Sequence, residues 1–481
     1  MPKLYISAVN KKINLKQKGD APMRKITATK PSFFLNVLGG NEVVKAYHNK
    51  YNKIDQLLES NPHILELIHS DLKNYGDTQT RECPYSSEQI LRMAIVKDME
   101  NWTYRDTIIR INESDFLRNF TRIGMGKIMS FGFLCGAINR VNTETWNEIN
   151  GHLALYAIEK EMINGDSMRL DSTVCETNIH YPTDNALLWD SYRVVSRIIR
   201  NCNELAPELN MGYRFHDKKI KKLYTYIATH SGKKNKSTKR KIKQYMKILI
   251  ERVGRICEIS MHYSDHAQSC PQNSVLVFSQ LAELKRILPL AKQVVDQSYR
   301  IHILGEKVPA AERIYSIFEE HTELFKRGKS GKPLEFGHLV TIGQTKEKFI
   351  SYYDVRIKSQ HDSVMKDEAL QSHKELFGTL PDKFTADKNY YVSMDDIEEL
   401  EKEMSICAIG KKGNRNEQEY DREHSEDFKT MQRFRAGVEG TISFLKRVFG
   451  MSRCINRGFK HFASTVARAI LCHNIVVLSR A

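Results

Sequence analysis

The sequence predicts an α/β core, built on a mixed sheet, that carries a large helical insert and follows an all-helical N-terminal domain. Three observations predict it. The length of 481 residues corresponds to about three domains at roughly 150 residues each. Hydrophobic residues make up 41% and charged residues 27%, an ordinary globular composition that excludes a wholly disordered or fibrous chain. Strand-like segments begin only after Asp166, whereas residues 40–160 have helical periodicity.

The N-terminal third divides into an arm and a helical domain. Residues 1–30 are basic and rich in turn formers, which predicts a flexible basic arm. Residues 31–160 are predicted to form the helical domain, with prolines after residue 40 only at Pro62 and Pro84. The run Ser86–Glu88 directly precedes apolar residues and predicts a helix start. Short amphipathic helices in a basic protein are compatible with DNA binding, although the pattern alone is not specific.

The predicted core begins with the segment Met168–Thr177, which is rich in β-branched residues and alternates in polarity. Arg169 and Asp171 fall on one face of this strand and Leu170 on the other. Further strands are predicted at Glu335–Gly343, Lys348–Ile357 (a hairpin turning near Thr345), Lys383–Asp387 and Ser405–Ile409. Helices are predicted at Ser363–Phe377, Met394–Glu403 and Phe428–Phe449, with a polar loop over residues 411–427. This order is compatible with an RNase H-like core formed by residues 161–190 and 326–460, although other α/β folds share parts of it.

The insert, residues 191–325, is predicted to be helical, and residues 461–481 form a predicted C-terminal helix. Between Lys218 and Lys247 the insert holds twelve Lys or Arg and no acidic residue. One interpretation is a segment that binds the DNA backbone, with Lys233, Lys234 and Lys236 at its centre. The other is a solvated or disordered basic loop. The two are compatible, because disordered basic segments often order on nucleic acid.

Charge and cysteine usage narrow the class of protein. Lys and Arg total 74 against 58 Asp and Glu, a formal charge of +16, which suggests a polyanionic partner such as nucleic acid. We find no apolar run near the roughly 18 residues that a membrane span needs, and no apolar core near the start that would make a secretory signal. The nine cysteines are scattered and form no CxxC pair, which argues against a disulfide framework or a zinc ribbon and suits a reducing cytoplasm.

Two local patterns are set aside. Gly328-Lys329-Ser330 ends like a phosphate-binding loop, but Glu323 stands where that loop requires Gly, which excludes an ATPase of this type. His262, His266 and Cys270 recur every four residues and could bind zinc, but no second ligand cluster accompanies them. A solvated helix face is the better interpretation.

Two aspartates of the predicted core are candidates for phosphodiester chemistry, which commonly uses two divalent cations held by carboxylates. Asp171 lies in the middle of a strand, where a charge is costly unless it is paired or liganded; a solvent-facing position is the equal alternative. Asp387 ends its strand, the place where open α/β sheets bind ligands. Its alternative role is to cap the next helix.

Glu439 is the third candidate. Gln432, Arg435, Glu439 and Lys446 fall within roughly 60° of one another on the predicted helix. The Arg435–Glu439 pair could be an ordinary surface ion pair, worth a few tenths of a kcal/mol. However, Glu439 is the last acidic residue of the chain, and several cations follow it, beginning with Lys446 and Arg447. A lone acid at the head of a basic surface favours a metal ligand held against phosphates.

Several segments resemble the DDE-type transposases of bacterial insertion sequences. The run Arg169–Asp184 resembles their first-aspartate motif, Thr385–Tyr391 their second, and Arg435–Glu439 continuing to Lys446 their glutamate helix. Glu335–His338 resembles the strand that follows the first motif, and Ser86–Phe120 resembles the helical N-terminal domain of these enzymes. Two departures stand out: Gln432 replaces a Tyr of some relatives, and the insert follows the first strand.

The resemblance implies an RNase H-like fold with Asp171, Asp387 and Glu439 as the catalytic triad. They would hold two Mg²⁺ ions, for which Mn²⁺ would substitute, and act on water or a 3′-hydroxyl. Arg435, Lys446, Lys388 and Arg447 would contact DNA phosphates. The helical N-terminal domain would bind the terminal inverted repeats of the element, and a homodimer would handle two DNA ends with the target. Such an enzyme is cytoplasmic and associated with the nucleoid.

Two alternatives remain open. The first is a metal-dependent DNA nuclease that shares the triad but does not join strands. The second is a non-catalytic DNA-binding relative that tolerates the loss of Asp171 or Glu439.

Overall fold

The computed structural model describes residues 25–28, 41–73, 75–76, 83–268, 275–329 and 332–480. Most of the predicted arm, together with Cys270 and Ser330, lies outside these residues. The chain forms two compact units, Met1–Glu176 with His338–Ala481, and Thr177–Gly337. The domain limits given above stay a prediction.

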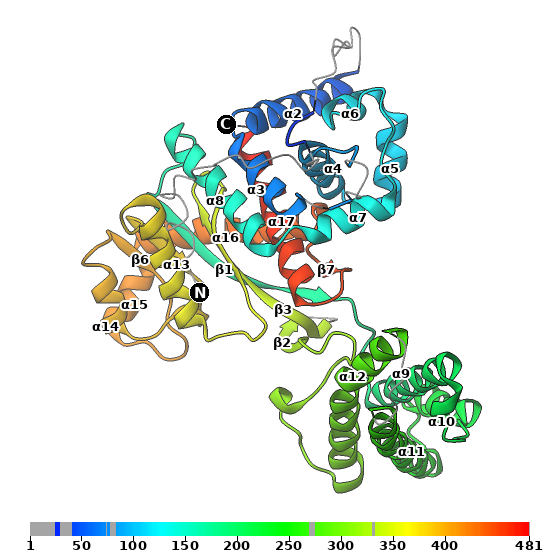
Figure 1. Ribbon diagram of the computed structural model, residues 1–481. Helices are drawn as coiled ribbons and strands as arrows, with labels where there is room; N and C mark the ends of the chain where they lie inside the picture. The colour runs from blue at the N-terminus through cyan, green and yellow to red at the C-terminus, as the bar shows by residue number, and fades with distance from the viewer. Residues whose placement is uncertain are drawn as a thin grey trace. The chain divides into compact units, whose positions relative to one another are not determined.

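The N-terminal part of the first unit is helical (Figure 1), as the periodicity predicted. Helix α4 begins where the sequence placed a helix start: the side chain of Ser86 accepts from the backbone of Gln89, and the Gln89 side chain accepts from the backbone of Ser86. The backbone carbonyls of Lys25 and Ile26 accept hydrogen bonds from this same first turn. The helices are α2 (Glu42–Glu59), α3 (His63–Leu72), α4 (Ser87–Met99), α5 (Tyr104–Glu113), α6 (Asp115–Phe120), α7 (Phe131–Arg140) and α8 (Thr143–Glu159).

The C-terminal helix α17 (Phe459–Leu478) forms part of the same core as these N-terminal helices. It packs against α8, α4 and α2 on one side and against a strand of the sheet on the other. Asn474 hydrogen-bonds both the N–H and the carbonyl of Ile350 on that strand. By length and composition α17 is the one helix among the described residues that could cross a membrane, but 83% of its apolar window is buried in the protein.

The sheet contains all five predicted strands and two more. Its order is β2-β3-β1-β5-β6, with β4 paired to β3 and β7 paired to β1. β1 pairs in parallel with β5, and β5 with β6, whereas β3 pairs antiparallel with β2 and β4. The strands are β1 (Ser167–Thr177), β2 (Glu323–Lys329), β3 (Lys332–Thr345), β4 (Ile350–Val355), β5 (Lys383–Ala386), β6 (Ile406–Ala408) and β7 (Arg453–Cys454).

Helices alternate with the later strands, which gives the predicted α/β, RNase H-like class with its helical N-terminal region. The predicted polar loop over residues 411–427 is wrong in part, because a short helix forms within it. The Asn416 side chain caps that helix by accepting a hydrogen bond from the backbone N–H of Glu419. The Glu419 side chain in turn accepts one from the backbone N–H of Asn416. The helices are α13 (Asp362–Phe377), α14 (Met394–Leu400), α15 (Glu417–His424) and α16 (Glu426–Val448).

The second unit is mainly helical and has its own hydrophobic core. The prediction of helix up to about residue 325 is wrong over roughly its last twenty residues. The helical segment ends at Leu304, a single 3₁₀ turn follows at Ala310–Glu312, and Glu323–Lys329 forms β2 and pairs with the first half of β3. These seven residues lack the spacing of apolar residues that marks a helix, and their backbone groups form hydrogen bonds with β3. Such pairing with a distant strand cannot be recognised from local periodicity. The helices of this unit are α9 (Asp184–Leu205), α10 (Asp217–His230), α11 (Lys236–Gln268) and α12 (Val275–Tyr299), followed by a π-helical turn at Arg300–Leu304.

Candidate active site

Two of the predicted site residues lie level with each other on neighbouring strands. In the parallel pair β1–β5, Leu170 is the partner of Ala386. Asp171 and Asp387 are the next residue on each chain segment. Neighbouring strands lie about 4.8 Å apart, so the register brings two carboxylates separated by more than two hundred residues to one place on the sheet. This place is the carboxyl end of β5, where α/β sheets bind ligands.

The two aspartates differ in their local contacts. The Asp171 side chain is 18% exposed, and its Oδ1 accepts the backbone N–H of Ser172 at 2.7 Å. The charge of Asp171 also acts on the buried side chain of Tyr390, whose pKa is raised by burial first and by the charges of Asp362 and Asp171 as well. Asp387 accepts from the backbone N–H of Lys388 at 2.8 Å and from the Asn389 amide at 3.1 Å. It caps a single 3₁₀ turn, Lys388–Tyr390, and its carboxylate is held at the end of the strand.

Glu439 approaches this place from α16, through Arg435. The Arg435 guanidinium has one nitrogen 3.9 Å from Asp171 Oδ2 and the other 3.5 Å from Glu439 Oε1. An arginine therefore lies between two of the predicted triad carboxylates. The Glu439 side chain is 64% exposed and free to turn. Among the described residues, no three His, Cys, Asp or Glu side chains are close enough together to hold a metal ion as they stand.

Gln432, which departs from the motif of some relatives, holds Arg435 in position. Its amide nitrogen donates to the Ala408 carbonyl at the end of β6, at 2.8 Å. Its Oε1 accepts from Arg435 Nε at 3.2 Å. The glutamine thus connects the last strand of the sheet to the arginine beside Asp171.

Sequence reasoning missed a second arginine that fastens α16 to the sheet. Arg169, two residues before Asp171 on the same strand face, is buried. It donates to Gln344 Oε1 at 2.8 Å and to the backbone carbonyl of Phe434 at 2.8 Å, and its guanidinium lies over the Phe434 ring. No carboxylate pairs with it among the described residues, and burial lowers its pKa to about 10. The alternation of the strand puts Arg169 on the same face as Asp171, and this is the sequence signal that could have found it.

The close approach of α16 to Arg169 depends on Gly437. A Cβ atom at this position would lie 2.1 Å from Arg169 Nη1, whereas at Gly440 it would meet nothing within 4 Å. Four residues beyond Gly437, in contrast, Thr441 is buried, and its hydroxyl accepts a hydrogen bond from the amide of Gln344 at 3.0 Å. Arg169, Gln344 and Thr441 therefore fix the part of α16 that carries Arg435 and Glu439.

The other predicted DNA-binding residues occupy three places. Lys388 is exposed directly after Asp387, and Arg447 is exposed near the end of α16. Lys446 is partly buried near β1: burial raises the pKa of Cys175 on that strand, and the charge of Lys446 acts in the opposite direction. Lys233, Lys234 and Lys236 belong to the second unit, where they are exposed around the start of α11.

Comparison with known protein families finds one match, which covers about a third of the chain. Residues 322–475 match the family model described as the transposase DDE domain. The match confirms the predicted relation to DDE-type transposases. Asp387 and Glu439 lie inside the matched residues, whereas Asp171 lies before them and is joined to them by the β1–β5 pairing. No curated protein and no solved structure gives a significant match.

Proposed function

We propose that this chain, which carries a transposase DDE domain, is the DNA transposase of a bacterial insertion sequence. It binds the terminal inverted repeats of the element and catalyses Mg²⁺-dependent strand cleavage and strand transfer through Asp171, Asp387 and Glu439. The observation that carries the proposal is the parallel register that sets Asp171 level with Asp387, with Glu439 linked to Asp171 through Arg435.

The donor set fits a divalent cation, because three carboxylates supply the hard oxygen ligands that Mg²⁺ and Mn²⁺ prefer. When bound there, the metal supplies a nucleophile at neutral pH and stabilises the leaving oxygen. Asp171 and Asp387 hold the ligand positions on rigid strands, and the exposed Glu439 turns in from its helix. This turning is required because the three do not form a closed group as they stand.

Arg435 has two successive partners in this proposal. Without a cation it balances the charge of Asp171 and Glu439. A cation held by these carboxylates would neutralise them, and the Arg435 guanidinium would then be available to a DNA phosphate, which it can bind through two parallel hydrogen bonds. Lys388, Lys446 and Arg447 contact the neighbouring phosphates. Most of the acceleration comes from positioning and charge stabilisation around an in-line displacement.

The proposed roles of the N-terminal region and of a dimer follow from the need to join two DNA ends to one target. The helical N-terminal region recognises the terminal repeats, and two copies of the chain act together because two DNA ends are cut and joined to one target. The enzyme works on double-stranded DNA in the bacterial cytoplasm, at the nucleoid.

The test is a cleavage and strand-transfer assay with Mg²⁺ on DNA that carries the element's own ends. We expect joined products with the wild type and none with Asp387→Asn. Asp382→Asn is the matched control, since this exposed aspartate undergoes the same chemical change just before β5. Cleavage without joining would instead identify a nuclease, and repeat binding without metal-dependent cutting a non-catalytic relative. Loss of joining in both variants would show that Asp387 has no special role.

A further inference from the structure

The helices α10 and α11 of the second unit, together with the turn between them, present an unusually dense set of positive charges. Twelve Lys or Arg lie between Lys218 and Lys247, and all twelve are exposed. No ion pair involves any of them in the part of the chain that the structure describes, and the segment contains no acid. α11 also begins without an acidic residue in its first turn, so the positive end of its dipole adds to the same charge.

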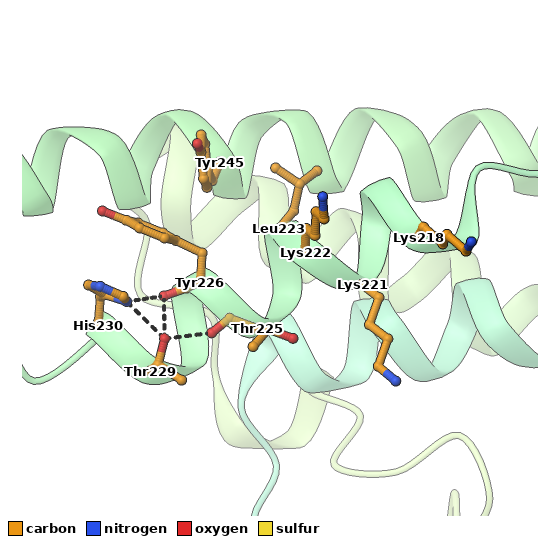
Figure 2. Close-up of a pocket in the computed structure, with 9 residues that line it drawn as sticks. All are labelled: Lys218, Lys221, Lys222, Leu223, Thr225, Tyr226, Thr229, His230 and Tyr245. Atoms are coloured by element: carbon orange, nitrogen blue, oxygen red, sulfur yellow. Dashed lines mark hydrogen bonds between the residues drawn. The ribbon is translucent and has the colours of Figure 1, made fainter.

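These charges border a groove of about 680 Å³ between the two helices (Figure 2). Lys218, Lys221 and Lys222 line it from α10. Lys218 is three and four residues from Lys221 and Lys222, so it is a neighbour of each on the helix surface. Figure 2 shows Lys221 and Lys222 pointing to opposite sides of α10, so the cations spread around the helix. α10 is about 21 Å long at 1.5 Å per residue, a length over which duplex DNA carries about a dozen phosphate charges.

Aromatic side chains at the end of the groove hold a further lysine over their rings. Tyr226 stacks on His230 with ring centroids 4.1 Å apart, and the edge of Tyr245 meets Tyr226 at 4.9 Å. Lys241 Nζ lies 4.8 Å from the centre of the Tyr226 ring and 5.4 Å from that of Tyr245. The rings are thus engaged with His230, Lys241 and each other, which leaves them poorly suited to stack on a nucleotide base. Their role here is to position a cation.

We propose that the α10–α11 face is a separate, sequence-independent binding surface for the phosphate backbone of double-stranded DNA. The inference rests on the proposed function, which makes DNA the substrate, and assigns the insert a role in holding it. Closely spaced exposed cations without ion pairs favour phosphates, because each contact releases counterions and no internal ion pair has to be broken. Single-stranded nucleic acids are commonly bound by stacking their bases on aromatic rings. Because the rings of Tyr226 and Tyr245 already contact His230, Lys241 and each other, contact with the DNA phosphate backbone is favoured over base stacking.

The experiment measures binding of the full chain to a fluorescent 30-base-pair duplex of arbitrary sequence, at several salt concentrations and without Mg²⁺. One variant is Lys218→Gln, Lys221→Gln, Lys222→Gln; a second is Lys233→Gln, Lys234→Gln, Lys236→Gln. The matched control is Lys285→Gln, Arg286→Gln, Lys307→Gln, which removes three exposed cations from other parts of the same unit.

We expect each variant of the face to bind at least about tenfold more weakly at 0.1 M salt, with a salt slope shallower by about 2 to 3. The control is expected to bind like the wild type. Equal binding by all four proteins would overturn the inference, and so would a preference for a single strand or for duplex RNA over duplex DNA. Asp387→Asn is assayed for cleavage beside them. If it abolishes cutting while the face variants bind normally, the inference fails and the proposed function stands; if no form binds DNA, both fail.

Discussion

The cations of the first unit and those of the α10–α11 face are used in different ways. In the first unit, Arg92 is buried and paired with Asp55 and Glu88, and Arg468 is buried and paired with Asp98. Arg169 is buried against a glutamine and a backbone carbonyl. The lysines of the α10–α11 face are exposed and form no ion pair among the described residues. The first group holds helices and strands together, whereas the second remains available to a partner. Three changes to groups packed inside the first unit and one change to the exposed lysines test this difference.

The largest effect is expected from Arg468→Ala. Arg468 Nε donates to Asp98 Oδ2 at 2.7 Å and thereby links α17 to α4. Burial alone would raise the pKa of Asp98, but the charges of Lys97 and Arg468 keep it lowered. Removing one partner of a buried pair costs about 3–5 kcal/mol when the other charge stays buried alone. Lys97 Nζ remains 2.8 Å from Asp98 Oδ1, so we expect a loss of about 3 kcal/mol, the lower end of that range. Urea unfolding measures the loss, with the exposed Arg110→Ala as a control that changes stability by less than about 0.5 kcal/mol. Equal losses in the two variants would contradict the comparison.

The second effect concerns two histidines that are buried as neutral rings. His373 Nε2 donates to the Gly165 carbonyl and His473 Nε2 to the Lys348 carbonyl, each at 2.9 Å. Burial lowers the pKa of each to about 4. Their pKa in the unfolded chain is about 6.5, so the unfolded state takes up protons first as the pH falls below that value. Stability is therefore unaffected above about pH 7 and falls by about 2 kcal/mol per histidine at pH 5.

The measurement is urea unfolding at pH 7 and pH 5. His473→Gln keeps an N–H donor for the Lys348 carbonyl but cannot be protonated. We expect its loss of stability between the two pH values to be smaller than that of the wild type by about 2 kcal/mol. The same loss in both proteins would show that His473 does not contribute to the acid sensitivity.

The third effect comes from two glycines on α16, Gly437 and Gly440, which differ in the space available for an added Cβ atom. Gly437→Ala is expected to destabilise the protein by about 1–3 kcal/mol, because its Cβ would lie 2.1 Å from Arg169 Nη1. Gly440→Ala meets nothing within 4 Å and is expected to stabilise the helix by about 0.5–1 kcal/mol. The melting temperatures of both variants and of the wild type, measured by thermal unfolding, test this prediction. A stabilising Gly437→Ala would mean that Arg169 does not hold α16 in this position.

The smallest effect is expected from Lys218→Gln, Lys221→Gln, Lys222→Gln. Neutralising three exposed lysines without ion pairs changes stability by less than about 0.5 kcal/mol each, and relief of like-charge repulsion makes a small gain possible. Calorimetry of the same preparations used for DNA binding measures this. A large loss of stability would show that these lysines are structural after all.

The comparison also separates what local sequence reveals from what it does not. Strand alternation placed Arg169 and Asp171 on one face, and the three-and-four spacing placed Arg435 and Glu439 on one helix stripe. Both patterns depend on neighbours within a few residues, and the elements formed as predicted. The short helix at Glu417–His424 and the strand at Glu323–Lys329 were missed, because the first is polar throughout and the second is recognised by its pairing with β3.

By itself, the sequence determined the fold class, the main strands and helices of the core, and the positive charge of the insert. These follow from periodicity, capping residues and composition, which are local properties. Only the tertiary structure decided that Asp171 lies level with Asp387, that Arg435 lies between Asp171 and Glu439, and that α17 completes the core of the N-terminal helices. The physical reason is that strand register and helix packing are chosen by burial between segments hundreds of residues apart, and no window of neighbouring residues contains that information.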